Sequence, residues 1–421
     1  MVDDNLKSSD QLDIQKLKTK KQRSTTRSAL IAAIFLMATS AIGPGFITQT
    51  ATFTAKLGAA FGFAILVSII IDIVVQLNIW RIIALTKKRA SDLANEAIPG
   101  SGYILAILVV IGGMAFNIAN LGGTQVGLSA MTGYNTPWFG AFSAAIAIFI
   151  FLSKKAGMTV DRLMIILGFT MIIMTLFVAF VSQPPVGVAL YQTVWPDTID
   201  FPTITTIVGG TIGGYIIYAG AHRLLDSNTV GRENLSAVTK GAFTGILVTG
   251  IMRYILFLAI FGVVVSGVNI LMTGQNPASV AFQSTLGSIG LRLFGFIFWC
   301  AAITSVIGAA YTSVSFLFTF KKDMTSKQRS YITVIFILIS LVLYLTLGAN
   351  PTALLVFAGG FNGLILPIGM SIFMYIGWCR SDLMGGYRYS RILLTLGTLA
   401  CLLSWYMAIV SFKPIFEFLS L

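Results

Sequence analysis

The sequence predicts an all-α polytopic membrane protein of about 11 transmembrane helices, arranged as a 5+5 inverted repeat with broken helices 1 and 6. Of its 421 residues, 56% are hydrophobic and 10% are charged, whereas soluble domains carry about 25% charged residues. The apolar residues form runs of roughly the 20 residues that a bilayer requires. Two glycine-rich interruptions lie five runs apart, which is the spacing that an inverted repeat of five helices produces.

The N-terminal segment is polar and charged and lacks the pattern of a cleavable signal peptide. We expect residues 1–28 to be a disordered cytoplasmic tail that lies against an anionic leaflet. The net charge of +13 does not predict nucleic-acid binding, because the Lys and Arg side chains fall in short loops between apolar runs. Cys300, Cys379 and Cys401 show no metal-ligand spacing and give no disulfide framework.

The stretch Gly43-Pro44-Gly45-Phe46 interrupts the first apolar run. Proline removes a backbone donor and clashes with the preceding turn, and the flanking glycines add backbone freedom. We therefore expect a discontinuous helix whose halves cover about residues 29–42 and 46–57. Broken backbone at membrane depth survives only where it is buried or lines a cavity, and secondary transporters build their substrate sites at such breaks.

Ten further apolar runs predict the remaining spans. They cover about residues 61–86, 102–130, 137–153, 160–182, 204–226, 242–266, 290–320, 331–348, 352–378 and 391–412. Almost all Lys and Arg residues fall in alternate loops, so the positive-inside rule places the N-terminus in the cytoplasm and the C-terminus outside. The longest outer loops are expected at residues 181–201 and 267–290. The pattern predicts a multi-pass protein of the cytoplasmic cell membrane.

A second break is predicted in the sixth span, where Gly213-Gly214 lies about ten residues after the helix begins. The alternative is helix packing, because Gly209 with Gly213 and Gly210 with Gly214 each form a G-x-x-x-G pair. The break is favoured because spans one and six are five apart and enter the membrane from opposite sides.

Three regions follow from this arrangement. Residues 1–28 are the tail and residues 29–378 are the transporter core, with helices 1–5 at about 29–182 and helices 6–10 at about 204–378. Residues 379–421 hold the additional helix 11 and the C-terminus.

Several stretches resemble the Nramp family of divalent-metal transporters, within the larger group that has the LeuT-like fold. Gly43-Pro44-Gly45-Phe46 lies where that family has Asp-Pro-Gly-Asn. Asn117-Ile118-Ala119-Asn120 lies where it has Asp-Leu-Ala-Glu, and Gly213-Gly214-Tyr215 where it has Met-Pro-His. The resemblance implies a LeuT-like inverted repeat and transport by alternating access.

The sequence departs from the family at the residues that hold the metal. The resemblance implies that positions 43, 46 and 213 would ligate the ion, yet here they are Gly43, Phe46 and Gly213. Transition metals need carboxylate, imidazole or sulfur donors, and magnesium needs oxygen donors. The sequence therefore predicts no metal ligands at this site and no cofactor. The third-helix acids that the family associates with proton movement are amides here, Asn117 and Asn120.

The remaining residues favour a small organic acid or an amino-acid-like substrate. Helix N-termini at the two breaks attract anions through their free N–H groups. Small hydroxyls, one amide and aromatic rings would line the pocket, unless the hydroxyls only satisfy local backbone. The candidate substrate-binding residues are Ser40, Gly43, Gly45, Phe46, Gln49, Asn117, Asn120, Thr211, Gly213, Gly214 and Tyr215.

Ionisable groups inside a membrane are expensive and are candidates for function. Asp72 and Arg253 lie at similar depth in spans two and seven, which predicts an ion pair; the alternative is a coupling-ion or proton site at Asp72. The only histidine, His222, could relay protons, or it could be an anchor beside an Arg223–Asp226 pair.

Two hydroxyls, Thr304 and Ser305, fall where LeuT-like folds often place sodium, so the coupling ion is expected to be sodium or a proton.

The sequence thus predicts a secondary active transporter of a small organic substrate. The first alternative is a divalent metal ion (manganese, iron or magnesium) transporter, which could be proton-coupled, and the second is a transporter-like receptor or channel. An enzyme is not expected, because no nucleophile–base pairing or cofactor motif is present.

Overall fold

The computed structural model describes residues 42–153, 166, 170–226, 228–272, 274–320 and 325–420. The predicted tail, Ser40 and almost all of the first half of helix 1 lie outside these residues. The described residues form helices, and no strand occurs among them. In chain order the α-helices are α2 (Pro44–Leu57), α3 (Phe61–Thr86), α4 (Ala90–Ala97), α5 (Ser101–Thr132), α6 (Trp138–Leu152), the helix Thr170–Ser182, α8 (Val186–Val194), α9 (Phe201–Ile212), α10 (Ile216–Asp226), α11 (Leu235–Val265), α12 (Pro277–Phe316), α13 (Ser326–Leu347), α14 (Pro351–Cys379) and α15 (Arg391–Glu417).

The predicted all-α polytopic class is confirmed. Eight helical stretches of the described residues are long and apolar enough to cross a membrane, or up to nine if the bent pair Thr170–Ser182 and Val186–Val194 forms one span. The number is lower than the predicted eleven because α2 and α3 follow each other through one 3-10 turn and together form Pro44–Thr86, while α6 has only 15 residues. Each predicted span from the second onward nevertheless contains a helix.

The predicted break in span six is present. Helix α9 ends at Ile212 and α10 begins at Ile216. Between them Gly213 is extended and Gly214 has φ 55°, a left-handed conformation that glycine adopts without the steric cost of a side chain. At the other break, α2 begins at Pro44, with Gly43 as its N-cap. Proline is well suited to the first helical position, and the second half of helix 1 begins there, two residues before the predicted residue 46.

Three helical elements occur where loops were expected. Helix α4 follows the basic loop after α3, and α8 lies within the predicted outer loop at residues 181–201. The start of α12 lies within the loop predicted at residues 267–290, and the chain kinks at Gly287, where φ is 65° and ψ is −161°. These elements are shorter than a membrane span, so a search for long apolar runs does not find them.

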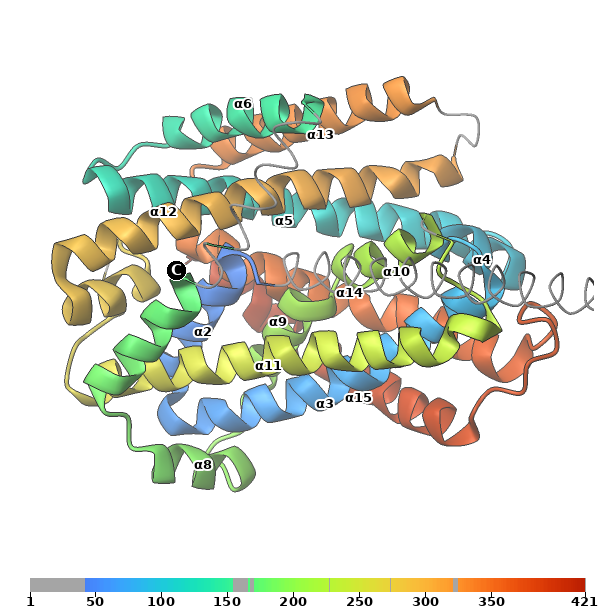
Figure 1. The fold of residues 1–421 in the computed structure, drawn as a ribbon, viewed down its shortest axis with the longest axis horizontal. Helices are drawn as coiled ribbons and strands as arrows, with labels where there is room; N and C mark the ends of the chain where they lie inside the picture. Colours follow the sequence, from blue (N-terminus) through green and yellow to red (C-terminus); the bar gives the residue numbers. More distant parts are fainter. Residues whose placement is uncertain are drawn as a thin grey trace, which may run out of the picture.

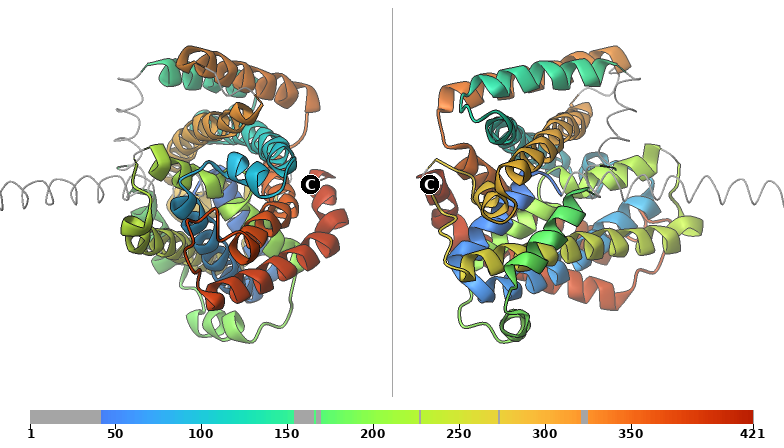
Figure 2. Two further views of the ribbon diagram at one scale, coloured as in Figure 1. Left: turned by 90° about the vertical axis from the view of Figure 1, so that its right-hand side faces the viewer. Right: turned by 60° about the vertical axis from the view of Figure 1, so that its left-hand side comes forward.

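Three short helices, α2, α9 and α10, lie in the middle of a layered bundle. Figure 1 shows α2, α9 and α10 between α5 and α12 on one side and α3 and α11 on the other. Helices α6 and α13 lie next to each other as a further layer outside α5 and α12, which the two views of Figure 2 also show. The discontinuous elements are therefore enclosed by long helices, as broken backbone in a membrane requires.

Helices α9 and α14 touch backbone to backbone along three glycines, which we call the glycine seam: Gly209, Gly359 and Gly363. A Cβ atom on Gly209 would lie 2.1 Å from the Gly359 oxygen and 2.2 Å from the Gly363 nitrogen. A Cβ atom on Gly363 would lie 2.3 Å from the Thr205 oxygen. Gly209 therefore serves helix packing, while Gly213 and Gly214 form the break, so both interpretations of this glycine-rich stretch apply to different residues.

Contacts between loops agree with the predicted alternation of sides. Arg89 pairs with Asp226 at 2.6 Å, and Arg380 donates to the Glu96 and Ala97 oxygens at 3.0 Å, all within loops predicted on one side. Arg380 also hydrogen-bonds Asp382 and thereby holds the pKa of that carboxyl below its usual range.

At the other end of the bundle Lys56 pairs with Asp200 at 2.7 Å. Both residues are predicted to lie on the opposite side from the basic loops. Which end faces the cytoplasm stays a prediction.

Candidate functional site

A small cavity lies where the central helices meet beside the break. Its volume is about 10 Å³, which is about the space of one water molecule. The lining comes from α2 and its N-cap, α5, α9, the break, α12 and α14. The lining residues are Gly43, Gly45, Phe46, Gln49, Phe116, Ala119, Asn120, Gly210, Tyr215, Ser305 and Leu355.

Gln49 joins three helices at this cavity. Its Nε2 donates to the Leu355 oxygen on α14 at 3.0 Å, while its Oε1 is buried without a hydrogen-bond partner among the described residues. Two glycines make room for the side chain, because a Cβ atom on Gly210 would lie 2.4 Å from Oε1 and one on Gly359 would lie 2.3 Å from Nε2. An unpaired buried acceptor is costly, so this oxygen is suited to a donor or a cation that binds in the cavity.

Ser305 supplies a second oxygen without a partner. Its Oγ is buried, forms no hydrogen bond with the described residues, and lies 2.8 Å from the position of a Cβ atom on Gly43. The neighbouring Thr304 is different, because its hydroxyl donates to the Cys300 and Ala301 oxygens at 3.2 and 3.0 Å. Of the two predicted ion-binding hydroxyls, only Ser305 faces the central cavity.

Asn117 and Asn120, the two candidate amides of α5, have different surroundings. Asn120 lines the cavity, whereas the Nδ2 of Asn117 donates to the Ser340 hydroxyl of α13 at 3.0 Å. Asn117 is fully buried, and its Oδ1 has no partner among the described residues. Of these two candidate substrate-binding residues, only Asn120 therefore lines the central cavity.

Tyr215, the first residue after the glycine pair, lines the cavity and packs edge-to-face on Phe116 with ring centroids 5.6 Å apart. Gly213 and Gly214 lie outside the lining. A Cβ atom on Gly213 would lie 2.4 Å from the Gly209 oxygen, and one on Gly214 would lie 1.9 Å from the Asn362 Oδ1. The glycine pair is thus required by close packing at the break, and it does not leave open space for a substrate.

Asp72 and Arg253 face each other across a second cavity of about 10 Å³. Both are almost fully buried, at 1% and 2% exposure, yet no direct salt bridge joins them within 4.0 Å. Asp72 Oδ1 and the Nε and Nη2 atoms of Arg253 have no partner among the described residues. The predicted contact is therefore indirect, and the cavity has room for about one bridging water molecule.

Arg253 also connects this cavity to the central one. Its guanidinium lies over the Phe46 ring at 4.2 Å from the centroid, and Nη1 donates to the Ile207 oxygen at 3.2 Å. Phe46 lines the central cavity, so the two charges of Asp72 and Arg253 lie directly behind it. Thr211 lines the Asp72–Arg253 cavity instead of the central one, and its hydroxyl donates to the Ile207 oxygen at 2.7 Å.

His222 is buried away from both cavities. Its Nε2 accepts a hydrogen bond from the Ala90 N–H at 3.4 Å, and its Nδ1 has no partner among the described residues. The ring packs against Phe316 with centroids 5.2 Å apart. The predicted Arg223–Asp226 pair is wrong, because Asp226 instead binds Arg89 at the start of α4, an element that the sequence analysis does not predict.

Four residues of the central lining do not appear among the predicted candidates. Phe116 and Ala119 lie within one turn of Asn120, so the helical period of α5 could have indicated them. Gly210 belongs to a G-x-x-x-G pair. Leu355 lies in the first turns of α14 and carries no signal in the sequence.

An all-helical bundle in which a discontinuous span borders a buried polar cavity is typical of secondary transporters. Solved structures of similar fold include a manganese transporter from Eremococcus coleocola, with TM-score 0.73 and 13% identity over 94% of this chain and 87% of that one. The complex of MhsT with L-phenylalanine has TM-score 0.62 and 18% identity, covering 90% and 97% of the two chains. These similarities define the fold as LeuT-like.

A family model described as "Natural resistance-associated macrophage protein-like" matches residues 34–412. The chain belongs to this family, Nramp, and is a transporter-type multi-pass membrane protein. It is 48% identical over 396 residues to "Uncharacterized membrane protein YcsG" of Bacillus subtilis, which covers 94% of this chain and 96% of that protein. It is 47% identical over 394 residues to an "Uncharacterized membrane protein" of Haemophilus influenzae, which covers 94% and 97%.

Proposed function

We propose that the chain is a secondary transporter of the Nramp family that moves a hard divalent cation, such as Mn²⁺ or Mg²⁺, through the central cavity by alternating access. The observation that carries this proposal is the pair of buried oxygens without partners, Gln49 Oε1 and Ser305 Oγ, on a cavity about as large as one water molecule. Both are acceptor atoms, and carbonyl and hydroxyl oxygens suit Mg²⁺ and Mn²⁺.

The comparisons also favour the metal alternative over the organic substrate that the sequence analysis prefers. The family resemblance implies divalent-metal transport, and the similar solved structures include a manganese transporter. None of the comparisons supports an organic acid directly. A cavity of about 10 Å³ is also too small for an amino-acid-sized molecule in this conformation.

The ligand atoms that line the central cavity limit the type of metal ion that it could bind. The described residues contain no group of three His, Cys, Asp or Glu side chains that could hold a metal, and the central lining has no thiol or imidazole. Soft transition-metal binding therefore does not fit the central cavity. Affinity for a hard cation rises with the number of charged ligands, so a neutral oxygen set predicts weak binding. Arg253 lies behind Phe46 and Asp72 faces it across the second cavity, so the repulsion that a cation would meet depends on the charges of both groups.

Uptake of radiolabelled Mn²⁺ into proteoliposomes tests the proposal. Ser305→Ala removes one oxygen with almost no change in volume and should reduce Mn²⁺ uptake at low concentration about tenfold, the equivalent of ~1.4 kcal/mol. Ser313→Ala is the matched control, because Ser313 also lies on α12 with a buried, unpartnered Oγ but does not line the cavity. It should leave uptake unchanged.

The second candidate is transport of a small organic solute, which a much larger cavity at one end of the bundle favours. Absence of Mn²⁺ and Mg²⁺ uptake in the parent protein, together with gradient-driven uptake of labelled amino acids or carboxylates, would overturn the proposed cation and support this candidate. Repeating the assay with sodium and with proton gradients identifies the coupling ion, which stays a prediction.

A further inference from the structure

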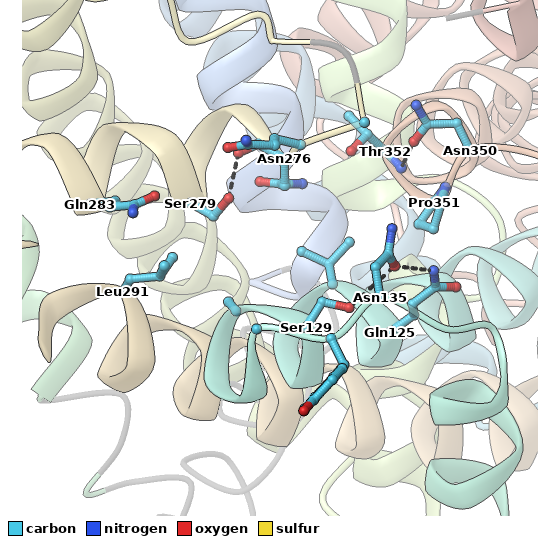
Figure 3. Close-up of a pocket in the computed structure, with 16 residues that line it drawn as sticks. Gln125, Ser129, Asn135, Asn276, Ser279, Gln283, Leu291, Asn350, Pro351 and Thr352 are labelled. Carbon is cyan, nitrogen blue, oxygen red and sulfur yellow. Dashed lines mark hydrogen bonds between the residues drawn. The ribbon is translucent and has the colours of Figure 1, made fainter. Parts of the chain in front are cut away.

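A polar cavity much larger than the central one lies at the end of the bundle where α5 finishes and where α12 and α14 begin. Its volume is about 350 Å³, which is within the usual range for small-molecule sites, whereas the central cavity holds about one water molecule. Figure 3 shows side chains from all three helices surrounding it. We call it the amide cavity. Its polar lining residues are Gln125, Ser129, Tyr134, Asn135, Gln275, Asn276, Ser279, Gln283, Asn350 and Thr352.

The lining carries no side-chain charge. None of its residues is Asp, Glu, Lys, Arg or His, and most of its polar groups are carboxamides or hydroxyls. Such groups can both donate and accept hydrogen bonds. A cavity of this kind holds water-soluble molecules by hydrogen bonds, and it offers a cation no carboxylate.

A chain of hydrogen bonds fixes the amides of α5. The Tyr344 hydroxyl donates to Gln125 Oε1, and Gln125 Nε2 donates to Asn135 Oδ1 at 2.6 Å. Ser129 also donates to Asn135 Oδ1, at 3.3 Å. Because the oxygen of Asn135 already accepts two hydrogen bonds, its Nδ2 is the group left for a ligand. Figure 3 shows that nitrogen directed toward the start of α14.

The opposite wall presents two helix N-termini. Asn276 caps α12 by accepting from the Ala278 N–H at 3.1 Å, and Asn350 caps α14 by accepting from the Thr352 N–H at 2.9 Å. The positive ends of two long helices thus meet at one cavity, with no side-chain charge in its lining to offset them. Pro277 and Pro351 have no N–H, and the caps accept from the Ala278 and Thr352 N–H groups, so the two helix ends attract a carboxylate mainly through their partial positive charge.

The amide cavity is also tied to the centre of the bundle. Asn276 Nδ2 donates to the Thr48 hydroxyl of α2 at 2.9 Å, next to Gln49 in the sequence. A ligand that contacts Asn276 therefore contacts the same hydrogen-bond chain that positions the helix of the central cavity. Thr48 joins Asn276 of the amide cavity to α2, the helix that carries Gln49.

We propose that the amide cavity is a binding site for a small carboxylate of about amino-acid size that carries a second polar group. The cavity volume sets the size, the partial positive charge of the two helix N-termini attracts the carboxylate, Asn135 Nδ2 donates to it, and the remaining amides bind the second group. This site is separate from the proposed cation site, and it stands independently of which ion the central cavity takes.

The test measures binding without transport. Leu291→Cys in a Cys379→Ser background places a thiol on the cavity wall, and the rate of its alkylation in detergent reports occupancy. The probes are glutarate, L-glutamine and glutaramide, which share a five-carbon chain, and MnCl₂. We expect millimolar glutarate and L-glutamine to slow alkylation, and glutaramide and MnCl₂ to leave it unchanged. Equal protection by glutaramide, protection by Mn²⁺, or no protection by either carboxylate would overturn the proposal.

Variants assign the effect to the cavity. Asn135→Asp replaces the free donor by a negative group of the same size and should weaken glutarate protection about tenfold. Asn269→Asp is the matched control, because Asn269 is exposed in the loop before α12 and does not line the cavity. If Asn135→Asp does not fold, Thr352→Val removes one lining hydroxyl at constant volume and should also weaken protection. Unchanged protection in the folded variant contradicts the assignment.

The two proposals fail separately. Loss of Mn²⁺ uptake in Ser305→Ala with no carboxylate protection supports the cation site alone. Carboxylate protection with no cation uptake supports the amide cavity alone.

Discussion

At the scale of single residues, the centre of the bundle contains buried polar atoms that the described residues do not pair. Gln49 Oε1 and Ser305 Oγ lie on one cavity, and Asp72 Oδ1 faces Arg253 across another. Unsatisfied buried polar groups destabilise a fold unless a ligand or water pairs them. Their concentration at two adjacent small cavities is the reason for placing function there.

The indirect Asp72–Arg253 interaction leads to a stability prediction. Asp72→Asn leaves Arg253 charged in a low-dielectric environment and should reduce the free energy of unfolding by about 3 kcal/mol. The double variant Asp72→Asn with Arg253→Gln removes both charges and should recover part of that loss. Thermal unfolding in detergent measures both effects.

Lys56→Gln is the control for a charge change at an exposed pair. Lys56 pairs with Asp200 at 2.7 Å, but its side chain is 48% exposed, so the change should cost less than about 1 kcal/mol. If the double variant shows the sum of the two single losses, Asp72 and Arg253 do not interact across their cavity.

At the scale of helices, the start of α2 at Pro44 and the break between α9 and α10 could be predicted from sequence because they depend on local chemistry. Gly43-Pro44-Gly45 and Gly213-Gly214 disrupt helical hydrogen bonding wherever they occur. Which glycines serve packing could not be predicted, because the contact of Gly209 with α14 depends on how two helices distant in sequence approach. The same limit applies to Asp226, whose partner Arg89 lies 137 positions away.

Some residues that line the central cavity could be predicted from sequence, and others could not. Phe46, Gln49 and Tyr215 follow the breaks directly and were predicted candidates that the cavity contains. Gly213 and Gly214 were expected to admit substrate, yet close packing against Gly209 and Asn362 occupies the space beside them. Leu355 contributes its backbone oxygen to the central site. Every residue has a backbone oxygen, so the residue type does not indicate this role.

The glycine seam gives a prediction for a single methyl group. Gly209→Ala would bring a Cβ atom to 2.1 Å from the Gly359 oxygen, so α9 and α14 must separate. Overpacking of this kind costs about 1–3 kcal/mol, and uptake should fall together with thermal stability. Thermal unfolding and Mn²⁺ uptake of the same preparation measure both.

Gly187→Ala is the matched control on α8, because nothing lies within 4 Å of the added Cβ atom. Alanine is a better helix former than glycine, so this variant should be neutral or slightly more stable. Equal effects of the two substitutions would show that the contact between α9 and α14 is not close.

At the scale of the whole molecule, contacts at each end of the bundle agree with the predicted alternation of the loops between two sides. Arg89, Arg232 and Arg380 bind partners in other loops predicted on the same side, and Lys56 binds Asp200 at the other end. The orientation of the bundle in the membrane follows from the positive-inside rule and is a separate prediction.

Cysteine labelling in intact cells tests that orientation. Thr198→Cys lies at an exposed position between α8 and α9 and should react with a membrane-impermeant thiol reagent. Glu233→Cys, exposed at the opposite end before α11, should react only after the membrane is permeabilised. The reverse pattern would invert the orientation and place the amide cavity in the cytoplasm. Cys379→Ser serves as the background, because Cys379 is the exposed native thiol.

The glycine seam also has a mechanical consequence. Helices with interlocking side chains have discrete resting positions, and moving between them requires rotamer changes and a barrier. Gly209, Gly359 and Gly363 present bare backbone, so none of these three residues has a side chain that would have to change rotamer if α9 shifted along α14. Gln49 contacts α14 beside this interface. A small shift along the glycine seam would therefore move the Gln49 amide relative to Tyr215. The backbone geometry of the seam would then determine how far the two residues move apart during the transport cycle.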